Sequence, residues 1–338
     1  MKYRHLGSSG LEVSRVCLGT MTFGNGEWGC DARGAREMTR VFLDAGGTFF
    51  DTADIYSAGV SEQMLGEALK GLPRDDLVVA TKCFFPMGKT PNRKGLSRAH
   101  ILSACEGSLK RLGMEYVDLY QIHGPDPFTP IDETMRALED VVRQGKVRYI
   151  GCSNLYAWQI VKANAAAQMA LGSRFACGQY LYNLIMRDVE REILPACQAE
   201  GMGFICWSPL GAGMLSGKYP RASKPEEGSR IQLSSVHEAP RYWHERGFAI
   251  VEELMKTSSQ IGVPPAQAAL SWLLHDRRVS SIIVGARTPA QLRENLAVGD
   301  WDIPQEAWER LEKASPFDHG YPKQWMDIAI PATFNDAE

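Results

Sequence analysis

Residues 50–62 read FDTADIYSAGVSE, and two later stretches have a similar form, VVATKCF at 78–84 and LYQIHGPDP at 119–127. In each stretch a short apolar run ends at a polar residue whose side chain can bind or transfer a proton. Asp51, Lys82 and His123 lie at or just past these predicted strand ends, and Tyr56 follows Asp51 closely. Catalytic groups of barrel enzymes come from the ends of several strands. The three stretches therefore predict one site.

The alternation of short apolar runs with longer amphipathic stretches repeats eight times along the chain. The runs are rich in Val, Ile, Phe and Tyr and are almost continuously apolar, which is typical of strands buried on both faces. Eight such repeats predict an α/β fold, a closed parallel (β/α)8 TIM barrel, with an open doubly wound sheet as the alternative. The predicted strands are 13–20, 48–54, 77–83, 116–123, 147–154, 175–183, 203–209 and 280–286. The predicted helices are 35–46, 61–70, 97–113, 133–145, 157–172, 189–201 and 264–276.

Three segments fall outside this repeat, and we expect all of them within a single domain, residues 1–338. Residues 2–13 (KYRHLGSSGLEV) predict an N-terminal hairpin that could plug the bottom of the barrel. Residues 218–246 form a long polar segment with Pro and Ser, which predicts an active-site loop. Near the C-terminus, residues 305–314 predict one more helix, which is followed by an aromatic-bearing extension with Phe317, Tyr321 and Trp325.

Composition limits the classes of function. The chain has 338 residues, 44% of them hydrophobic, and a net charge of −3. The absence of a Lys/Arg-rich run argues against a nucleic-acid or anionic-membrane surface. No apolar stretch approaches the roughly 20 residues of a membrane span, and the N-terminus lacks the apolar core of a signal peptide. Eight dispersed cysteines without a CxxC predict reduced thiols in a cytoplasmic protein. The histidines lack metal-ligand spacing, so we expect no metal, and nothing indicates an oligomer.

The four strand-end residues suggest proton donation to a carbonyl. A tyrosine phenol has an ordinary pKa of about 10, and a neighbouring ammonium would lower this pKa toward working pH. We therefore assign Tyr56 as the proton donor and Lys82 as the group that lowers the pKa of Tyr56. Asp51 would hold the lysine, and His123 would bind the substrate oxygen. Each of these four residues alone has an ordinary structural explanation, but their order and spacing along the chain together favour a catalytic site.

Seven phrases in the correct order resemble the aldo-keto reductase superfamily over essentially the whole chain. They are LGTMTFG at 18–24, DTADIYS with its following GVSE at 51–62, TK at 81–82, IH at 122–123, GCSN at 151–154, WSPLGAGMLSGKY at 207–219 and VGARTPAQLRENL at 284–296. The long loops resemble the bacterial long-chain branch, which includes potassium-channel β-subunits. The resemblance implies a barrel that binds NADP(H) without a Rossmann fold and interconverts carbonyls and alcohols.

The residues after the predicted strands indicate where the cofactor binds, and the resemblance implies that Gln291, Glu294 and Asn295 contact its adenosine. Trp207 would stack on the nicotinamide, and Ser153, Asn154 and Gln179 would hydrogen-bond its carboxamide. Arg287 and Arg230 would select NADP over NAD by pairing with the 2′-phosphate. The complete set expected to bind the cofactor is Gly19, Thr20, Met21, Asp51, Ser153, Asn154, Gln179, Trp207, Ser208, Pro209, Leu210, Gly211, Gly213, Lys218, Arg230, Gly285, Arg287, Gln291, Glu294 and Asn295.

Residues 24–29 (GNGEWG) fit the G-x-G-x-x-G pattern of dinucleotide-binding turns, but we reject that interpretation. The pattern requires a strand that runs directly into the first Gly, and here TMTF intervenes. We expect a loop over the barrel mouth with Trp28 as a wall of the substrate pocket. The other expected pocket residues are Phe84, Phe85, Gly124 and Phe128, and Gly124 would leave the pocket roomier.

Three functions are compatible with these sequence features. The leading one is an NADPH-dependent oxidoreductase that acts on a small carbonyl or alcohol substrate, an aldehyde, ketone or oxidised sugar. The second is an NADP-binding regulatory module, and the third is a Schiff-base lyase that uses Lys82 as nucleophile. The sequence leaves the physiological substrate and the favoured direction open.

Overall fold

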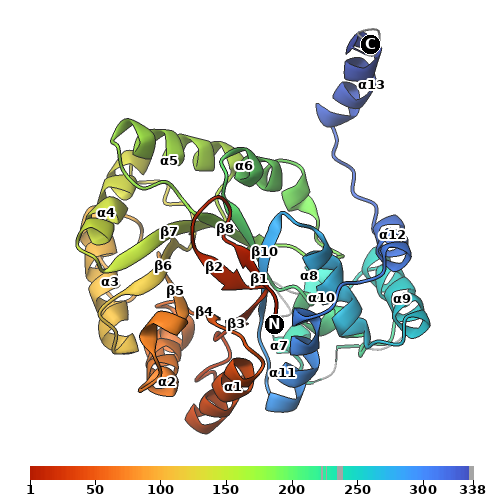
Figure 1. Ribbon diagram of the computed structural model, residues 1–338, viewed down its shortest axis with the longest axis horizontal. Helices are drawn as coiled ribbons and strands as arrows, with labels where there is room; N and C mark the ends of the chain where they lie inside the picture. Colours follow the sequence, from red (N-terminus) through yellow and green to blue (C-terminus); the bar gives the residue numbers. More distant parts are fainter. Residues whose placement is uncertain (222–223, 226, 234–238, 335–338) are drawn as a thin grey trace.

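Eight parallel strands close into a barrel in the order β10-β3-β4-β5-β6-β7-β8-β9 (Figure 1). The computed structural model describes residues 1–221, 224–225, 227–233 and 239–334. The strands are β3 (Val16–Gly19), β4 (Phe49–Asp51), β5 (Val78–Cys83), β6 (Val117–Ile122), β7 (Val147–Ser153), β8 (Cys177–Leu181), β9 (Gly203–Trp207) and β10 (Val279–Val284). The predicted (β/α)8 barrel is confirmed, and the open sheet is excluded.

Helices surround the barrel and cover its strands. They are α1 (Ala32–Asp44), α2 (Val60–Leu69), α3 (Arg98–Leu112), α4 (Ile131–Arg143), α5 (Ala157–Met169), α6 (Ile193–Ala199), α10 (Pro265–His275) and α11 (Pro289–Leu296). Several begin at a side-chain cap: Asp31 accepts a hydrogen bond from the Gly34 N–H, and Ser97 accepts one from the His100 N–H. Such caps satisfy backbone donors that have no partner inside the helix.

An antiparallel hairpin closes the bottom of the barrel, as the sequence predicts. Its strands are β1 (Tyr3–His5) and β2 (Glu12–Ser14). Leu6 and Val13 are fully buried and pack into the lower interior beside Phe49. The approach is so close that a Cβ on Gly7 would lie 2.3 Å from the backbone N of Gly203. Only glycine fits there, and the plug leaves the opposite end of the barrel for polar groups.

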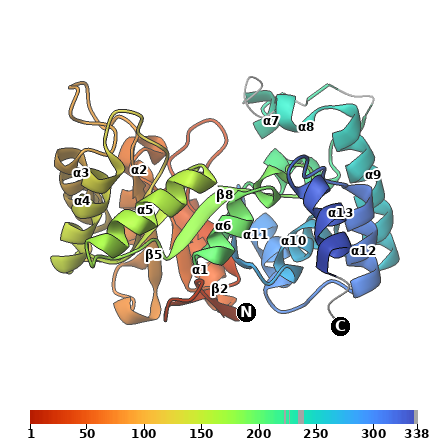
Figure 2. The same cartoon turned by 90° about the horizontal axis from the view of Figure 1, so that it is seen from above.

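The segment between β9 and β10 contains more helix than the sequence analysis expected. Two short helices, α7 (Arg230–Leu233) and α8 (Ala239–Tyr242), lie in the predicted loop, and α9 (Glu245–Gln260) follows. Figure 2 shows α7 and α8 beside the start of α9, at the end of the molecule opposite the hairpin. Residues 222–223, 226 and 234–238 of that loop lie outside the described part of the chain. We did not predict α9 because its start falls inside the segment that we took for a loop.

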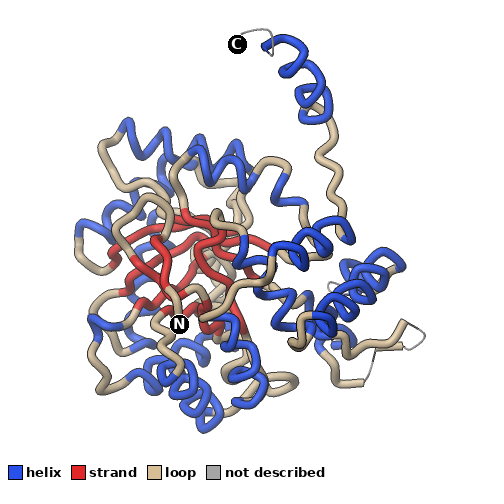
Figure 3. The backbone as a smooth tube through the Cα atoms, turned by 45° about the vertical axis from the view of Figure 1, so that its right-hand side comes forward, coloured by secondary structure: helices blue, strands red, loops and turns tan. Residues whose placement is uncertain are grey.

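The C-terminal extension contains two helices. The predicted helix is α12 (Gln305–Ala314), and α13 (Lys323–Phe334) follows an extended connection. Both Figure 1 and Figure 3 show α13 standing clear of the barrel. Among the described residues, no helix is long and apolar enough to cross a membrane.

Candidate active site

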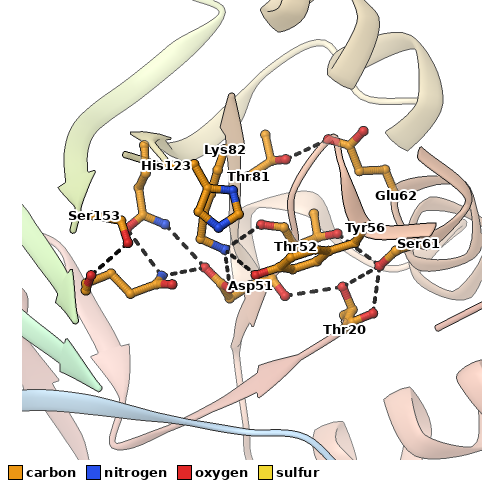
Figure 4. A network of polar contacts seen from close by, with 12 residues as sticks. Thr20, Asp51, Thr52, Tyr56, Ser61, Glu62, Thr81, Lys82, His123 and Ser153 are labelled. Carbon is orange, nitrogen blue, oxygen red and sulfur yellow. Dashed lines mark hydrogen bonds and ion pairs between the residues drawn. The ribbon is translucent and has the colours of Figure 1, made fainter. Parts of the chain in front are cut away.

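A layer of polar side chains fills the upper interior of the barrel, above the apolar plug. Lys82 is fully buried, and its ammonium donates to Asp51 Oδ1 at 2.5 Å and to the Thr52 carbonyl oxygen at 2.8 Å (Figure 4). The other carboxylate oxygen of Asp51 accepts from Gln179 Nε2 at 2.8 Å and from Gln121 Nε2 at 3.2 Å. Three donors therefore fix Asp51, and Asp51 in turn fixes the lysine.

Tyr56 begins the turn that connects β4 to α2. Within this turn Ser57 and Ala58 both have left-handed φ values, 48° and 53°. Each such conformation costs about 1–3 kcal/mol and persists only where the surroundings impose it. The hydroxyl of Ser57 donates to the Phe23 carbonyl at 3.0 Å, which ties the turn to the loop after β3. The Lys82 ammonium lies 3.4 Å from the Tyr56 hydroxyl, close enough to donate to it.

The electrostatics of Tyr56 correct one expectation. Burial raises the pKa of Tyr56, and Lys82 and Arg230 oppose this rise without cancelling it. The charge of the lysine alone predicts a lowered pKa for Tyr56, which is the opposite direction. The phenol is thus protonated at neutral pH, and Lys82 limits the rise of its pKa.

Lys82 itself is held in the charged form. Burial lowers the pKa of Lys82, but Asp51 and Tyr56 outweigh burial, so its pKa is raised. A charged ammonium has no lone pair with which to attack a carbonyl. This argues against the Schiff-base alternative.

His123 faces the same space from the end of β6. Its ring meets the ring of Tyr56 edge to face at 5.8 Å between centroids and the ring of Phe85 at 5.0 Å. Burial and the charge of Lys82 place the pKa of His123 well below its usual value. The buried Nδ1 has no hydrogen-bond partner among the described residues. The imidazole is therefore neutral at pH 7 and can donate one N–H to a substrate oxygen.

A cavity of about 710 Å³ opens at the carboxyl ends of the strands. It is lined by Asp51 and Gln179 of the polar layer and by most of the residues singled out in the sequence. Those lining residues are Gly19, Met21, Trp28, Asp51, Tyr56, Phe85, His123, Ser153, Asn154, Gln179, Trp207, Ser208, Pro209, Leu210, Gly213, Lys218, Arg230, Gly285, Arg287, Gln291, Glu294 and Asn295. The structure therefore brings residues from all eight strand ends and their loops to one place.

Two residues expected at the cofactor lie behind the cavity wall. Thr20 is fully buried, and its hydroxyl is 2.8 Å from the hydroxyl of Ser61. A Cβ on Gly211 would contact the buried ring of Tyr242 at 3.1 Å. Both positions support the wall from outside.

The substrate-pocket expectation also needs correction. Phe128 is 93% exposed on the outer surface. The ring of Phe84 occupies the space beside Gly124 and would lie 3.3 Å from a Cβ there. Gly124 therefore makes no room in the cavity, because the aromatic ring from the end of β5 has filled it. Of the expected pocket residues, Trp28 and Phe85 line the cavity.

A chain of hydrogen bonds fixes one wall of the cavity. Ser153 Oγ donates to the Gln179 carbonyl at 2.8 Å, and Asn154 Nδ2 donates to the His123 carbonyl at 3.0 Å. The indole N–H of Trp207 donates to Asn154 Oδ1 at 3.3 Å. Asn154 has a left-handed φ of 60°, which turns its amide toward these partners. The flat face of Trp207 is therefore held in one orientation at the cavity edge.

Four basic side chains contribute to the lining of the cavity. Lys218, Arg230, Arg241 and Arg287 all line it, in a chain whose net charge is negative. The start of α11 lies beside them, where the hydroxyl of Thr288 accepts from the Gln291 N–H at 3.3 Å. Cationic side chains and a helix N-terminus together favour an anion.

Two further positions of the candidate site were not predicted from the sequence. Gln121 could have been found, because residues two apart on a strand share a face and Gln121 precedes His123 by two. Arg241 carried no such signal, since it lies in α8, within the segment read as an irregular loop. No group of His, Cys, Asp and Glu suited to a metal occurs in the part of the chain that the structure describes.

Comparison with known proteins agrees with this architecture. The model of the aldo/keto reductase family matches residues 15–316, and the chain belongs to that family. A probable voltage-gated potassium channel subunit beta from Oryza sativa subsp. japonica is 39% identical, covering 96% of this chain and 98% of its own length. The uncharacterized oxidoreductase YrpG of Bacillus subtilis (strain 168) is 38% identical over 94% and 96%. Versiconal hemiacetal acetate reductase of Aspergillus parasiticus is 36% identical over 93% and 96%.

Proposed function

We propose that this chain reduces a small carbonyl compound to an alcohol with NADPH and that Tyr56 donates the proton. The observation that carries the proposal is the contact of the buried Lys82 ammonium with both Asp51 and the phenol of Tyr56. This contact lies at the wall of a cavity that His123 also faces. Family membership supports an oxidoreductase acting on carbonyl groups.

Each of the four side chains has a separate role at the carbonyl oxygen of the substrate. Tyr56 and the neutral His123 approach that oxygen from two sides and fix its position by hydrogen bonds. Bound NADPH would supply a hydride to the carbonyl carbon. The phenol of Tyr56 gives its proton to the oxygen, and the charge of Lys82 stabilises the phenolate that remains. Asp51 keeps the lysine charged and in contact with Tyr56.

The lining of the cavity suits a nicotinamide dinucleotide phosphate. It offers the flat ring of Trp207 and the amides of Asn154 and Gln179, which fit a nicotinamide and its carboxamide. It also offers Arg287 and three other basic side chains, which fit the pyrophosphate and a 2′-phosphate. This distribution of amide and cationic groups is our reason for proposing NADPH rather than NADH.

The thiols are our reason for proposing a cytoplasmic location. All eight cysteines are free, and seven of them are buried. Free thiols persist where the surroundings are reducing. We therefore place the enzyme in the cytoplasm.

A regulatory role is the second candidate, because several relatives are named as potassium channel β-subunits. A module of that kind would bind the cofactor and turn it over slowly or not at all. The presence of all four chemical groups in contact favours the enzyme.

The deciding experiment follows the absorbance of NADPH with purified protein and a panel of aldehydes, including 4-nitrobenzaldehyde. We expect steady oxidation over many turnovers, together with the alcohol as product. Tight binding of NADPH without turnover on any aldehyde, ketone or oxidised sugar would favour the regulatory module. Trapping of substrate on Lys82 by borohydride would instead indicate the lyase.

A further inference from the structure

Helix α5 has a second apolar stripe that points away from the barrel. Its inner positions Ile160, Ala163 and Ala167 are buried against the strands. On the opposite side, Trp158 is 62% exposed and Met169 is 87% exposed. A helix that is apolar on both sides is normally buried on both sides. The outer apolar stripe of α5 therefore resembles a surface that another protein segment buries.

This stripe forms one wall of an open groove, and α6 forms the other. The groove has a volume of about 610 Å³ and lies between Trp158, Val161 and Ala165 of α5 and Pro195, Ala196 and Ala199 of α6. Its only charged lining residues are Lys162 and Glu192. Small residues on α6 leave space for a large side chain between the two helices.

Helix α13 carries the complementary surface. Its exposed side chains include Trp325 at 62%, Met326 at 40%, Ile328 at 75% and Ile330 at 46%. It also carries one base and one acid, Lys323 and Asp327, which pair with each other along the helix. The helix stands clear of the barrel in Figures 1 and 3. One chain therefore presents an apolar arm and an apolar groove, each with a single acid and a single base.

The residues that precede α13, the helix that we call the arm, lie next to the α5–α6 groove. Arg191 donates to the carbonyl oxygens of Asp318 and His319 at 3.1 Å, and its guanidinium lies 5.4 Å from the ring of Phe317. The next residue, Glu192, lines the groove. An arm that leaves the body beside its own groove, but points away, can reach the same groove of a second copy across a two-fold axis. Such an exchange is reciprocal and closed.

We propose that two copies of this chain associate by exchanging α13 arms, so that each arm lies in the α5–α6 groove of the other copy. Trp325 of the arm and Trp158 of the groove are the central aromatic anchors. Aromatic side chains bury about 150–250 Å² each, and Trp158 and Trp325 are each 62% exposed, so these two residues over two contacts bring roughly 370–620 Å². The neighbouring Met, Ile, Val and Ala side chains raise the buried area toward the about 1,200–2,000 Å² of specific interfaces.

Sedimentation of the full chain tests this proposal. We expect a dimer at micromolar concentration, and dimerisation weakened by about 30-fold or more in Trp158→Asp and in Trp325→Asp, since each removes a central anchor. Phe128→Asp is the control, because Phe128 is 93% exposed but belongs neither to the groove lining nor to α13, so this variant should leave the dimer intact. All three variants should keep their circular dichroism and their carbonyl reduction, since none of the three residues lines the cavity.

A monomeric wild type would overturn the proposal. So would a Trp158→Asp variant as dimeric as the wild type.

Two further measurements show whether the segment bound in the α5–α6 groove is α13 of the second copy. In a mixture of the Trp158→Asp and Trp325→Asp variants, the intact arm of the first fits the intact groove of the second. The mixture should therefore form a heterodimer that neither variant forms alone. In the double variant Ala165→Cys with Ile328→Cys, oxidation should link two chains. Seven of the eight native cysteines are buried and will not compete. A disulfide formed within one chain would show that α13 folds onto its own groove, which contradicts an exchange.

Discussion

The proposed proton transfer depends most on Lys82, because among the described groups that oppose the effect of burial on the pKa of Tyr56 it alone lies within hydrogen-bonding distance of the phenol. In Lys82→Met the pKa of Tyr56 should rise further and the phenolate should lose its counter-charge. We expect carbonyl reduction to fall by about 10²–10⁴-fold, the usual contribution of general acid catalysis. Asp51→Asn keeps the ammonium but loosens it, so its activity should fall less. Steady-state rates at neutral pH check this order, and full activity in Lys82→Met would contradict it.

Asp54 is a buried carboxyl behind the site, and it makes stability depend on pH. Neither of its carboxylate oxygens has a hydrogen-bond partner among the described residues. Burial, with the nearby Glu62, raises the pKa of Asp54 to about 7. Between pH about 4 and 7 the folded state therefore holds a proton that the unfolded state has lost. The free energy of unfolding should fall as pH rises through this window and should remain low above it.

The variant Asp54→Asn removes this titration. Its stability relative to wild type should increase by about 2–4 kcal/mol between pH about 5 and 8.5, measured by urea unfolding. Asp126→Asn is the matched control. Although burial acts in the opposite direction, backbone N–H groups of Phe128 and Leu96 lower the pKa of Asp126, so that group is ionised throughout this range. The stability difference for Asp126→Asn should therefore be constant, and a constant difference for Asp54→Asn would refute the assignment.

At the scale of elements, the start of α11 should decide which cofactor binds. Only NADPH offers a 2′-phosphate to Arg287, so Arg287→Ala should weaken NADPH binding more than NADH binding. Losing a hydrogen bond between charged groups costs about 1.5–3 kcal/mol, which is roughly a ten- to hundredfold increase in Kd. Arg293→Ala is the control, because Arg293 is an exposed residue of the same helix and lies away from the cavity. Quenching of tryptophan fluorescence gives both dissociation constants. Equal losses for the two cofactors would mean that Arg287 is structural.

The N-terminal hairpin should stabilise the barrel through Leu6, which fills the lower interior with Val13 and Phe49. Leu6→Ala leaves a cavity there and should lower the free energy of unfolding by about 2–5 kcal/mol. Leu171→Ala, at a residue that is 90% exposed, should change it by less than about 0.5 kcal/mol. Denaturant titration compares the two. Similar values would show that the hairpin is not a part of the folded core.

Elements with a strong local pattern were predictable from the sequence. The barrel strands carry continuous apolar runs, and the residues after them reach the mouth because all eight strands run in parallel. The start of α9 was hidden because its cap, His244, lies within a polar segment that resembles a loop. Helix α13 was not predicted, and its apolar residues are exposed rather than packed.

At the scale of the whole molecule, the properties that escaped prediction depend on contacts between distant segments. The space beside Gly124 is filled by Phe84 from a different strand end, which no spacing within one segment reveals. The pKa of Tyr56 depends on how deeply the closed barrel buries it, so the charge of Lys82 alone gave the wrong direction. Arg241 reaches the cavity from α8, far along the chain from Asp51, Tyr56 and His123, which line the same cavity.

The central claim is that the phenol of Tyr56 delivers the proton at the mouth of the barrel. It is tested most directly by comparing Tyr56→Phe with Tyr149→Phe, since Tyr149 packs at the lower end of the same barrel. Both variants should bind NADPH with nearly the wild-type Kd. In NADPH oxidation with 4-nitrobenzaldehyde, Tyr149→Phe should match the wild type, and Tyr56→Phe should lose about 10²–10⁴-fold in kcat. Turnover of Tyr56→Phe near the wild-type rate would contradict the account.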